Sequence, residues 1–299
     1  MFMKKIHSEP YITDERERWW NKDYIQLLQK RFNLLNCKKV LDLGCGAGHW
    51  TKIIVSVIAE KPEIIVQDIE EEWVRRSSKL LKEIGYENVI GVVSDAHQLP
   101  FPDNSFDLVT CQTLLMHVED PKKVIKEMYR VLKPNGKVLV VESENLLSAV
   151  SQTSLDFSYD IDERALIFEF WLRYEDGKRK CGEGNNSVGV ELPGIFKDVG
   201  LLNCQFYLND KLQPEVTESI QQKISTSFLN SENNLFTKAE GHWNIETIKK
   251  YLIASGCSEK RLSKIIDSIT LHHHKLMETN DRYITAGVAC MIIGYGEKS

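Results

Sequence analysis

The chain has 299 residues, of which 42% are hydrophobic, and it carries a formal net charge of −5. A chain of this size and composition has enough apolar residues for a sizeable core, organised as one large domain or two small ones. The acidic balance argues against a protein that grips the phosphate backbone of a nucleic acid.

Seven cysteines are scattered along the chain, and none forms a Cys-x-x-Cys pair. An odd number without metal-ligand spacing argues against a disulfide framework or a zinc site. Residues 1–10 lack the apolar core of a signal peptide, and no run of about 18 apolar residues occurs. We therefore expect a cytoplasmic protein without a membrane span. We also expect no metal at His272-His273-His274, because adjacent residues on a helix point in different directions.

Hydrophobic periodicity predicts an N-terminal helix and then an alternation of strands and helices. The expected order is a helix over 11–35, a strand over 40–43, a helix over 50–58, a strand over 64–67, a helix over 70–84, strands over 89–93 and 106–111, a helix opened by Asp120-Pro121 and stopped by Pro134-Asn135-Gly136, and a strand over 137–141. Such an alternation predicts a parallel sheet whose two faces are both covered by helices.

The regular alternation fails after Glu142. The expected elements are a helical patch over 162–174, a charged glycine-rich loop over 175–189, a helix over 192–199, a strand over 202–208, largely helical chain over 214–278 and an apolar strand over 283–295. No internal repeat or low-complexity linker separates these elements.

The most informative motif lies where the first strand ends. Val40-Leu41-Asp42-Leu43 runs directly into Gly44-Cys45-Gly46-Ala47-Gly48. Alternating glycines let the backbone approach a ligand closely, and the N–H groups of the helix that follows can face a carboxylate. Asp42 can hold an ammonium group through a water or a backbone relay. The motif therefore suits a ligand that carries an amino acid moiety.

A dinucleotide-binding loop is the nearest competitor, because it also follows a strand. That fingerprint requires its third glycine at position 49, where this chain has His49. An aspartate before the first glycine would also repel a pyrophosphate. We therefore disfavour a nicotinamide cofactor.

The strand-plus-loop motif resembles motif I of the class I S-adenosylmethionine (SAM) methyltransferases, and four further segments agree with it. These are Asp68 at the end of strand two, Ser94-Asp95-Ala96 after strand three, the stretch Leu99 to Asp107, and the stretch Tyr129 to Lys137. The last two resemble the small-molecule branch akin to ubiquinone/menaquinone C-methyltransferases. Five motifs in the right order over 37–143 are far more specific than any one alone.

This resemblance implies an α/β fold with a doubly wound, Rossmann-like, seven-stranded sheet of order 3-2-1-4-5-7-6. Segments 202–208 and 283–295 would form its antiparallel final pair. The implied organisation is an N-terminal helical segment (1–36), a SAM-binding core (37–143), and substrate-side helical insertions with the last two strands (144–299), all in a single domain.

The resemblance also implies which residues hold SAM. Asp68 would accept both ribose hydroxyls, Asp95 the adenine amino group, and the Ala96 N–H would meet a ring nitrogen. Further candidates for contact with the cofactor are Asp42, Gly44, Cys45, Gly46, Gly48, Ile69, Cys111, Gln112 and, for the SAM carboxylate, Arg18.

The methyl group of SAM is already activated, so an in-line displacement needs alignment and the exclusion of water more than a base. His117 after strand four and Glu142 after strand five are the candidate catalytic residues; the alternatives are a structural histidine and a helix cap or ion pair. The acceptor is expected to be a small molecule. A protein or nucleic-acid substrate is the alternative, although Thr110-Cys111-Gln112-Thr113 lacks the Asn-Pro-Pro-Tyr-type motif that holds a flipped base. A SAM-binding protein without catalysis also stays open.

Overall fold

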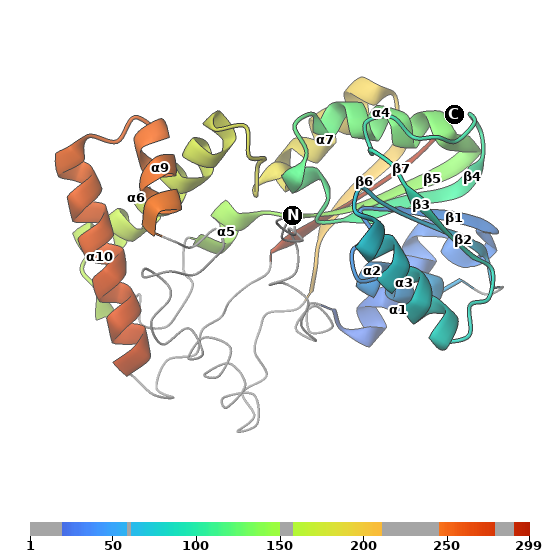
Figure 1. Ribbon diagram of the computed structural model, residues 1–299, viewed down its shortest axis with the longest axis horizontal. Coiled ribbons are helices and arrows are strands. Elements are labelled where there is room, and N and C mark those ends of the chain that lie inside the picture. Colours follow the sequence, from blue (N-terminus) through green and yellow to red (C-terminus); the bar gives the residue numbers. More distant parts are fainter. Residues whose placement is uncertain (1–19, 59–60, 150–157, 211–244, 279–289) are drawn as a thin grey trace, which may run out of the picture. The chain divides into compact units, whose positions relative to one another are not determined.

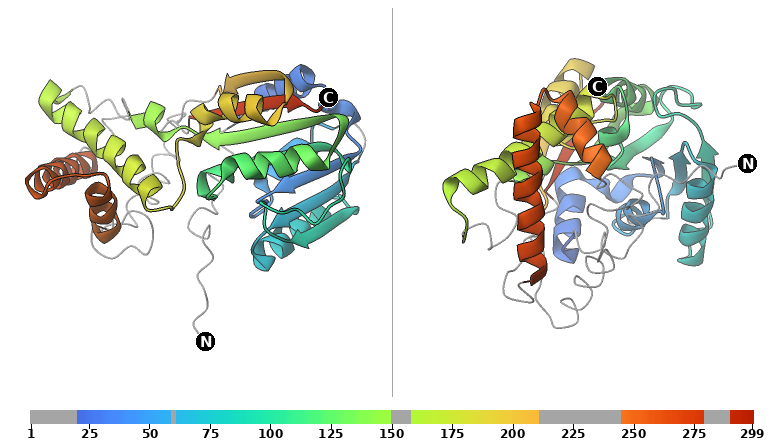
Figure 2. Two further views of the ribbon diagram at one scale, coloured as in Figure 1. Left: turned by 90° about the horizontal axis from the view of Figure 1, so that it is seen from above. Right: turned by 60° about the vertical axis from the view of Figure 1, so that its left-hand side comes forward.

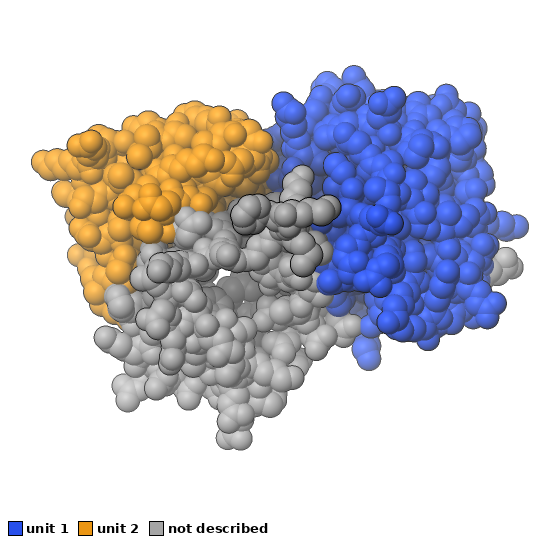
Figure 3. All heavy atoms as spheres, in the orientation of Figure 1, with its two compact units in different colours: residues 1–144, 187–211, 290–299 blue, residues 145–186, 212–289 orange. Residues whose placement is uncertain are grey.

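The structure divides the chain into two compact units (Figure 3). It is a computed structural model that describes residues 20–58, 61–149, 158–210, 245–278 and 290–299. Unit 1 comprises residues 1–144, 187–211 and 290–299, and unit 2 comprises residues 145–186 and 212–289. The first boundary falls one residue beyond the predicted 37–143 core. The expectation that residues 144–299 join this core in a single domain stays a prediction.

Unit 1 is built on a seven-stranded sheet of order β3-β2-β1-β4-β5-β7-β6 (Figure 1). The strands are β1 (Lys39–Leu43), β2 (Glu63–Asp68), β3 (Val89–Val93), β4 (Phe106–Gln112), β5 (Leu132–Ser143), β6 (Leu202–Leu208) and β7 (Met291–Glu297). Strands β1 to β5 are parallel, and β7 is antiparallel to both β5 and β6. The predicted order and the antiparallel final pair are confirmed, while residues 283–289 of the expected last strand lie outside the described ranges.

Helices cover both faces of this sheet (Figures 1 and 2). On one face lie α1 (Lys22–Phe32), α2 (His49–Val55) and α3 (Glu71–Glu83), and on the other lie α4 (Pro121–Val131) and α7 (Leu192–Val199). The aliphatic residues of the central strands alternate between two large cores, one under α4 and α7 and one under α1 and α2. Because helices cover both faces, β1 and β4 are buried along almost their whole length, and their residues do not alternate between buried and exposed.

Helix α4 begins at the predicted cap, Asp120-Pro121. Asp120 accepts a hydrogen bond from the Lys123 N–H at 2.9 Å, and Pro121 occupies the first turn. The helix ends at Val131, and β5 begins at once with Leu132, five residues before the expected strand. Proline at position 134 favours an extended residue before it, so the segment expected to be a turn continues the strand.

Unit 2 is helical. It contains α5 (Asn145–Ala149), α6 (Ile161–Lys180), α9 (Ile245–Ala254) and α10 (Glu259–Glu278). Its core consists of Phe170, Tyr174, Ile248, Tyr251, Leu252, Ile265 and Ile269. The expected loop over 175–189 is wrong for its first six residues, because α6 continues to Lys180. Gly177 does not break the helix; a Cβ built there would lie 1.8 Å from the Tyr251 carbonyl oxygen, so the missing side chain lets α9 approach.

The expected N-terminal helix is described only in part. Of the helix expected over 11–35, α1 covers Lys22–Phe32. A short 3-10 turn, η3, follows over Leu34–Asn36 and ends one residue beyond the expected range, and residues 11–19 lie outside the described ranges. Among the helices of the described part of the chain, none has the length and hydrophobicity that a membrane crossing requires.

Candidate cofactor and methyl-transfer site

The glycine loop joins β1 to α2 with three residues in the left-handed region. Gly44, Gly46 and Gly48 have φ values of 61°, 48° and 86°. A Cβ on Gly44 would lie 2.8 Å from the Leu114 side chain, whereas a Cβ on Gly46 would meet no atom within 4 Å. The loop therefore needs glycine for two reasons, close packing at Gly44 and backbone conformation at Gly46. Bare backbone at Gly46 faces open space, as a loop that meets a ligand requires.

Asp42 lies beneath this loop and is almost fully buried. One carboxylate oxygen accepts a hydrogen bond from the Thr51 hydroxyl of α2, and the other, Oδ1, is buried without a hydrogen-bond partner. Burial raises the pKa of Asp42 to about 7. The side chain thus ties β1 to α2 and leaves one acceptor unused.

Asp68, the last residue of β2, contacts the glycine loop directly. Its Oδ2 accepts the Gly46 N–H at 3.1 Å, and its Oδ1 accepts the Glu70 N–H at 3.1 Å. Burial raises the pKa of the Asp68 carboxyl, while these N–H groups lower it. A carboxylate offers about four lone-pair sites, so acceptor capacity remains for two further donors. Ile69, which follows, is 68% exposed.

Asp95 lies in the loop after β3, and its side chain is exposed. Oδ1 accepts the His97 N–H at 2.8 Å and lies 2.7 Å from His97 Nδ1. The His97 N–H lowers the pKa of Asp95 most. Oδ2 accepts no hydrogen bond from the described residues. Ala96 is buried against the core under α4.

Two predicted cofactor residues are cysteines whose side chains belong to the core. Cys45 packs with residues of α2, β2 and α3, and its N–H donates to the Gln67 carbonyl at 2.9 Å. Cys111 is fully buried in the core under α4, and burial raises the pKa of both thiols well above the usual value. Only the main chain of these residues is left to meet a ligand.

The end of β4 carries an unused donor and an unusual backbone. The Gln112 amide nitrogen is buried without a hydrogen-bond partner. Thr113 follows with φ of 52°, a costly conformation for a β-branched residue. Its N–H donates to the Val141 carbonyl at 2.8 Å, which holds the turn in place.

Glu142 and His117, the two candidate catalytic residues, have different surroundings. Glu142 is fully buried near the end of β5, where its carboxylate accepts the N–H groups of Leu114, Leu115 and Met116 at 2.9, 2.8 and 3.3 Å. Burial raises the pKa of Glu142 to about 7. His117 closes the short 3-10 turn η4 (Leu115–His117) and is exposed. Glu142 therefore holds the loop that carries His117.

Some predicted residues stay apart from this cluster, and one was missed. Arg18 lies outside the described residues. His272 Nδ1 lies 3.0 Å from the Tyr159 hydroxyl in unit 2, and the described residues contain no group of three metal-binding side chains. Gln67 was missed: its Oε1 accepts the Gly44 N–H at 3.4 Å and its amide donates to the Ser94 carbonyl. Its place before Asp68 was the available clue.

The amino-acid sequence matches a known methyltransferase family, in agreement with the topology of the sheet. The model of the ubiE/COQ5 methyltransferase family matches residues 12–166, more than half of the chain. The chain belongs to this family. It is therefore a SAM-dependent methyltransferase, and its acceptor is a small molecule.

Individual relatives in the ubiE/COQ5 methyltransferase family agree. A demethylmenaquinone methyltransferase of Anoxybacillus flavithermus is 37% identical over 197 residues, which cover 65% of this chain and 81% of the relative. A ubiquinone/menaquinone biosynthesis C-methyltransferase of Vibrio campbellii is 30% identical over 193 residues, covering 61% of this chain and 73% of the relative. A solved Bacillus halodurans structure has a TM-score of 0.52 at 16% identity, over 92% of this chain and 99% of that one, and supports the fold.

Proposed function

We propose that the chain transfers the methyl group of SAM to a ring carbon of a reduced quinone-type acceptor. The acceptor class comes from the two relatives, whose names specify quinone methylation. The cofactor side comes from geometry: Asp42 lies in β1, Asp68 ends β2 and Asp95 follows β3, three adjacent parallel strands, and Asp68 accepts the N–H of Gly46 in the glycine loop. This succession of acids is the observation that carries the proposal.

In the proposed complex, Asp68 accepts the two ribose hydroxyls, Asp95 accepts the adenine amino group and the exposed Ile69 side chain packs against the adenine ring. The loop Gly44 to Gly48 borders the methionine part, near the unused Oδ1 of Asp42 and the unused amide of Gln112. Each role uses an acceptor, donor or apolar surface that the fold leaves available.

Transfer breaks the bond between sulfur and the methyl carbon and forms a bond from that carbon to the acceptor. S-adenosylhomocysteine leaves, and the acceptor carbon then loses its proton. We propose His117 as the base that takes this proton, because it is exposed at the end of the loop after β4. We propose Glu142 as a positioning residue for that loop, because its buried carboxylate is occupied by backbone donors.

The test is an incubation of the full chain with SAM and a short-chain demethylated naphthoquinol under reducing conditions. Mass spectrometry should detect a ring-methylated product and an equal amount of S-adenosylhomocysteine. His117→Ala should lower turnover while leaving SAM affinity unchanged. SAM binding without a methylated quinol, together with methylation of another acceptor class, would reject the proposed substrate and keep the enzyme class.

We also propose that the protein works in the cytoplasm. All seven cysteines are free thiols, as expected in a reducing compartment. Cell fractionation should recover the chain with cytoplasmic markers, and recovery with the periplasmic or secreted fraction would contradict this location.

A further inference from the structure

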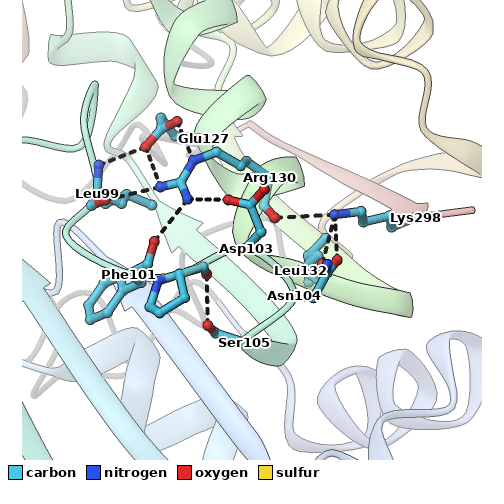
Figure 4. Close-up of polar contacts among 10 residues, drawn as sticks. Leu99, Phe101, Asp103, Asn104, Ser105, Glu127, Arg130, Leu132 and Lys298 are labelled. Carbon is cyan, nitrogen blue, oxygen red and sulfur yellow. Dashed lines mark hydrogen bonds and ion pairs between the residues drawn. The ribbon is translucent and has the colours of Figure 1, made fainter.

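The guanidinium group of Arg130 on α4 makes three hydrogen bonds to one loop and two to Glu127 (Figure 4). Nη1 donates to the Phe101 carbonyl at 2.8 Å and to Asp103 Oδ1 at 2.7 Å, and Nη2 donates to the Leu99 carbonyl at 3.0 Å. Nε and Nη2 each donate to Glu127 at 2.8 Å. An arginine has five N–H donors, so none is left over. The segment Leu99–Asp103 is called the anchored loop below.

Glu127 also binds the anchored loop. It lies one helical turn before Arg130, pairs with it through both oxygens, and accepts the Leu99 N–H at 2.8 Å. The Arg130 hydrogen bonds lower the pKa of Glu127 most. Leu99 is thus bound at both its N–H and its carbonyl. The two side chains are only 32% and 18% exposed, so water screens this pair less than a surface ion pair.

The far end of the anchored loop is fixed to the end of α4 as well. The Asn104 N–H donates to the Arg130 carbonyl at 3.3 Å. The Lys298 ammonium donates to Asn104 Oδ1 at 3.0 Å and to the Leu132 carbonyl at 2.9 Å (Figure 4). Position 104 has φ of 58°, which turns the chain into β4. The loop is therefore held at its start, its middle and its end.

The anchored loop begins four residues after Asp95. Ala96, Leu99 and Phe101 pack on the core under α4, and the Gln98 N–H donates to the Asp95 carbonyl at 3.1 Å. Asp95 is itself exposed, and its side chain accepts its hydrogen bonds from His97, not from α4. Its position thus depends on the short turn that Leu99 terminates.

We propose that Arg130, supported by Glu127, is a positioning residue of the adenosyl site, which fixes Asp95 and Ala96 where they meet the adenine ring. The inference rests on the proposed adenine contacts. Neither Arg130 nor Glu127 touches the cofactor; they order the loop before binding, so that its conformational entropy is not lost when the ligand arrives. Without Arg130 and Glu127, the Asp95 carboxylate would no longer be held in the position where it accepts the adenine amino group.

If Arg130 only stabilised the fold, its loss would have a different effect on ligand binding. Loss of folded protein would weaken every adenosyl ligand equally. Displacement of the Asp95 carboxylate would weaken the binding only of ligands that offer the adenine amino group. S-inosylhomocysteine replaces that amino group by a carbonyl oxygen and carries a proton on ring nitrogen N1, so the ratio of the two dissociation constants measures the adenine contacts of Asp95 and Ala96 together.

The experiment titrates wild type, Arg130→Met and Lys122→Met with both ligands by calorimetry. Lys122 is the matched control, because it lies on the same helix and forms an ion pair with Asp198 at 2.6 Å, away from the anchored loop. Wild type and Lys122→Met should prefer the adenosyl ligand by about tenfold or more, the value of a hydrogen bond to a charged group. Arg130→Met should lower that preference to about two- or threefold.

Three outcomes have distinct meanings. An unchanged preference in Arg130→Met overturns the inference and leaves the proposed site intact. No preference in wild type rejects the adenine contact of Asp95 and the inference with it. If Arg130→Met does not fold, Glu127→Gln is titrated instead, since it removes one charge of the pair and keeps its shape; it should give an intermediate preference, and a wild-type preference overturns the inference.

Discussion

Asp68 joins two loops that come from different strands. Its carboxylate accepts N–H groups from the glycine loop and from the start of the α3 segment, and acceptor capacity remains for a ligand. A side chain with this double role should affect both the ligand and the loop that presents it.

Replacing Asp68 by alanine should weaken S-adenosylhomocysteine binding by about tenfold or more, because both ribose hydroxyls lose a charged acceptor. Calorimetry measures the change. Asp107→Ala is the control: Asp107 also accepts backbone N–H groups, from Lys38 and Lys39, but near the start of β4. It should lower stability and keep affinity. Equal affinity of Asp68→Ala and wild type would remove Asp68 from the site.

Glu142 should make stability depend on pH. Its carboxyl has a pKa of about 7 in the folded protein and about 4.5 when unfolded. Between these values the folded state keeps a proton that the unfolded state has lost, so stability falls as pH rises. The free energy of unfolding falls by roughly 3 kcal/mol over this range, at about 1.4 kcal/mol per pKa unit. Urea unfolding should therefore show a larger drop from pH 5 to pH 7 in wild type than in Glu142→Gln. Identical drops would mean that Glu142 titrates normally.

The sequence was sufficient to find acids at strand ends but not to find the partners of Glu142. Asp42, Asp68 and Asp95 could be predicted because each follows an apolar run at a fixed place in the chain. The contact of Glu142 with Leu114, Leu115 and Met116 depends on how β4 and β5 are paired and where the turn at Thr113 directs the loop. Neither is encoded in a local pattern.

At the scale of elements, regular apolar periodicity gave reliable predictions and glycine gave a misleading one. Strands β3 and β6 and helix α7 have the expected bounds. Helix α6 runs six residues further than expected, through Gly177. In a sequence, a glycine suggests that a helix ends. Here Gly177 instead allows α9 to pack closely against α6, which only the tertiary structure reveals.

Gly177→Ala should destabilise unit 2 by about 1–3 kcal/mol or more, because the new methyl group meets main chain of α9 that cannot rotate away. Hydrogen exchange in α6 and α9, read by mass spectrometry, reports unfolding of this unit. Gly194→Ala in α7 is the matched control, since a Cβ there meets no atom within 4 Å. It should stabilise α7 by up to about 1 kcal/mol. A neutral Gly177→Ala would contradict the close crossing.

At the scale of the whole molecule, each unit has its own core. The residues proposed to hold the cofactor all belong to unit 1. The substrate-side role expected for residues 144–299 rests on the family resemblance, whereas the sequence of unit 2 predicted a helix over 162–174 and a largely helical chain over 214–278.

Binding of S-adenosylhomocysteine should slow hydrogen exchange in β1, β2 and β3 and leave exchange in α6 and α9 unchanged. A ligand stabilises the cooperative unit that binds it, and other units open as before. Hydrogen exchange read by mass spectrometry measures both regions in one sample. Asp68→Ala should show little slowing at the same ligand concentration. Equal slowing in α6 and β1 would mean that the two units open together.

Strand β7 lies between β5 and β6, although it follows both in the chain. During synthesis on the ribosome, β1 to β5 emerge and can pair while the outer edge of β5 waits for Met291–Glu297. Throughout this interval the buried valines of β5 border an unpaired edge, a template for pairing with another chain. The residues proposed to bind SAM are all synthesised long before the sheet is closed, so cofactor available during translation would stabilise the nascent half-sheet while it is most exposed to aggregation.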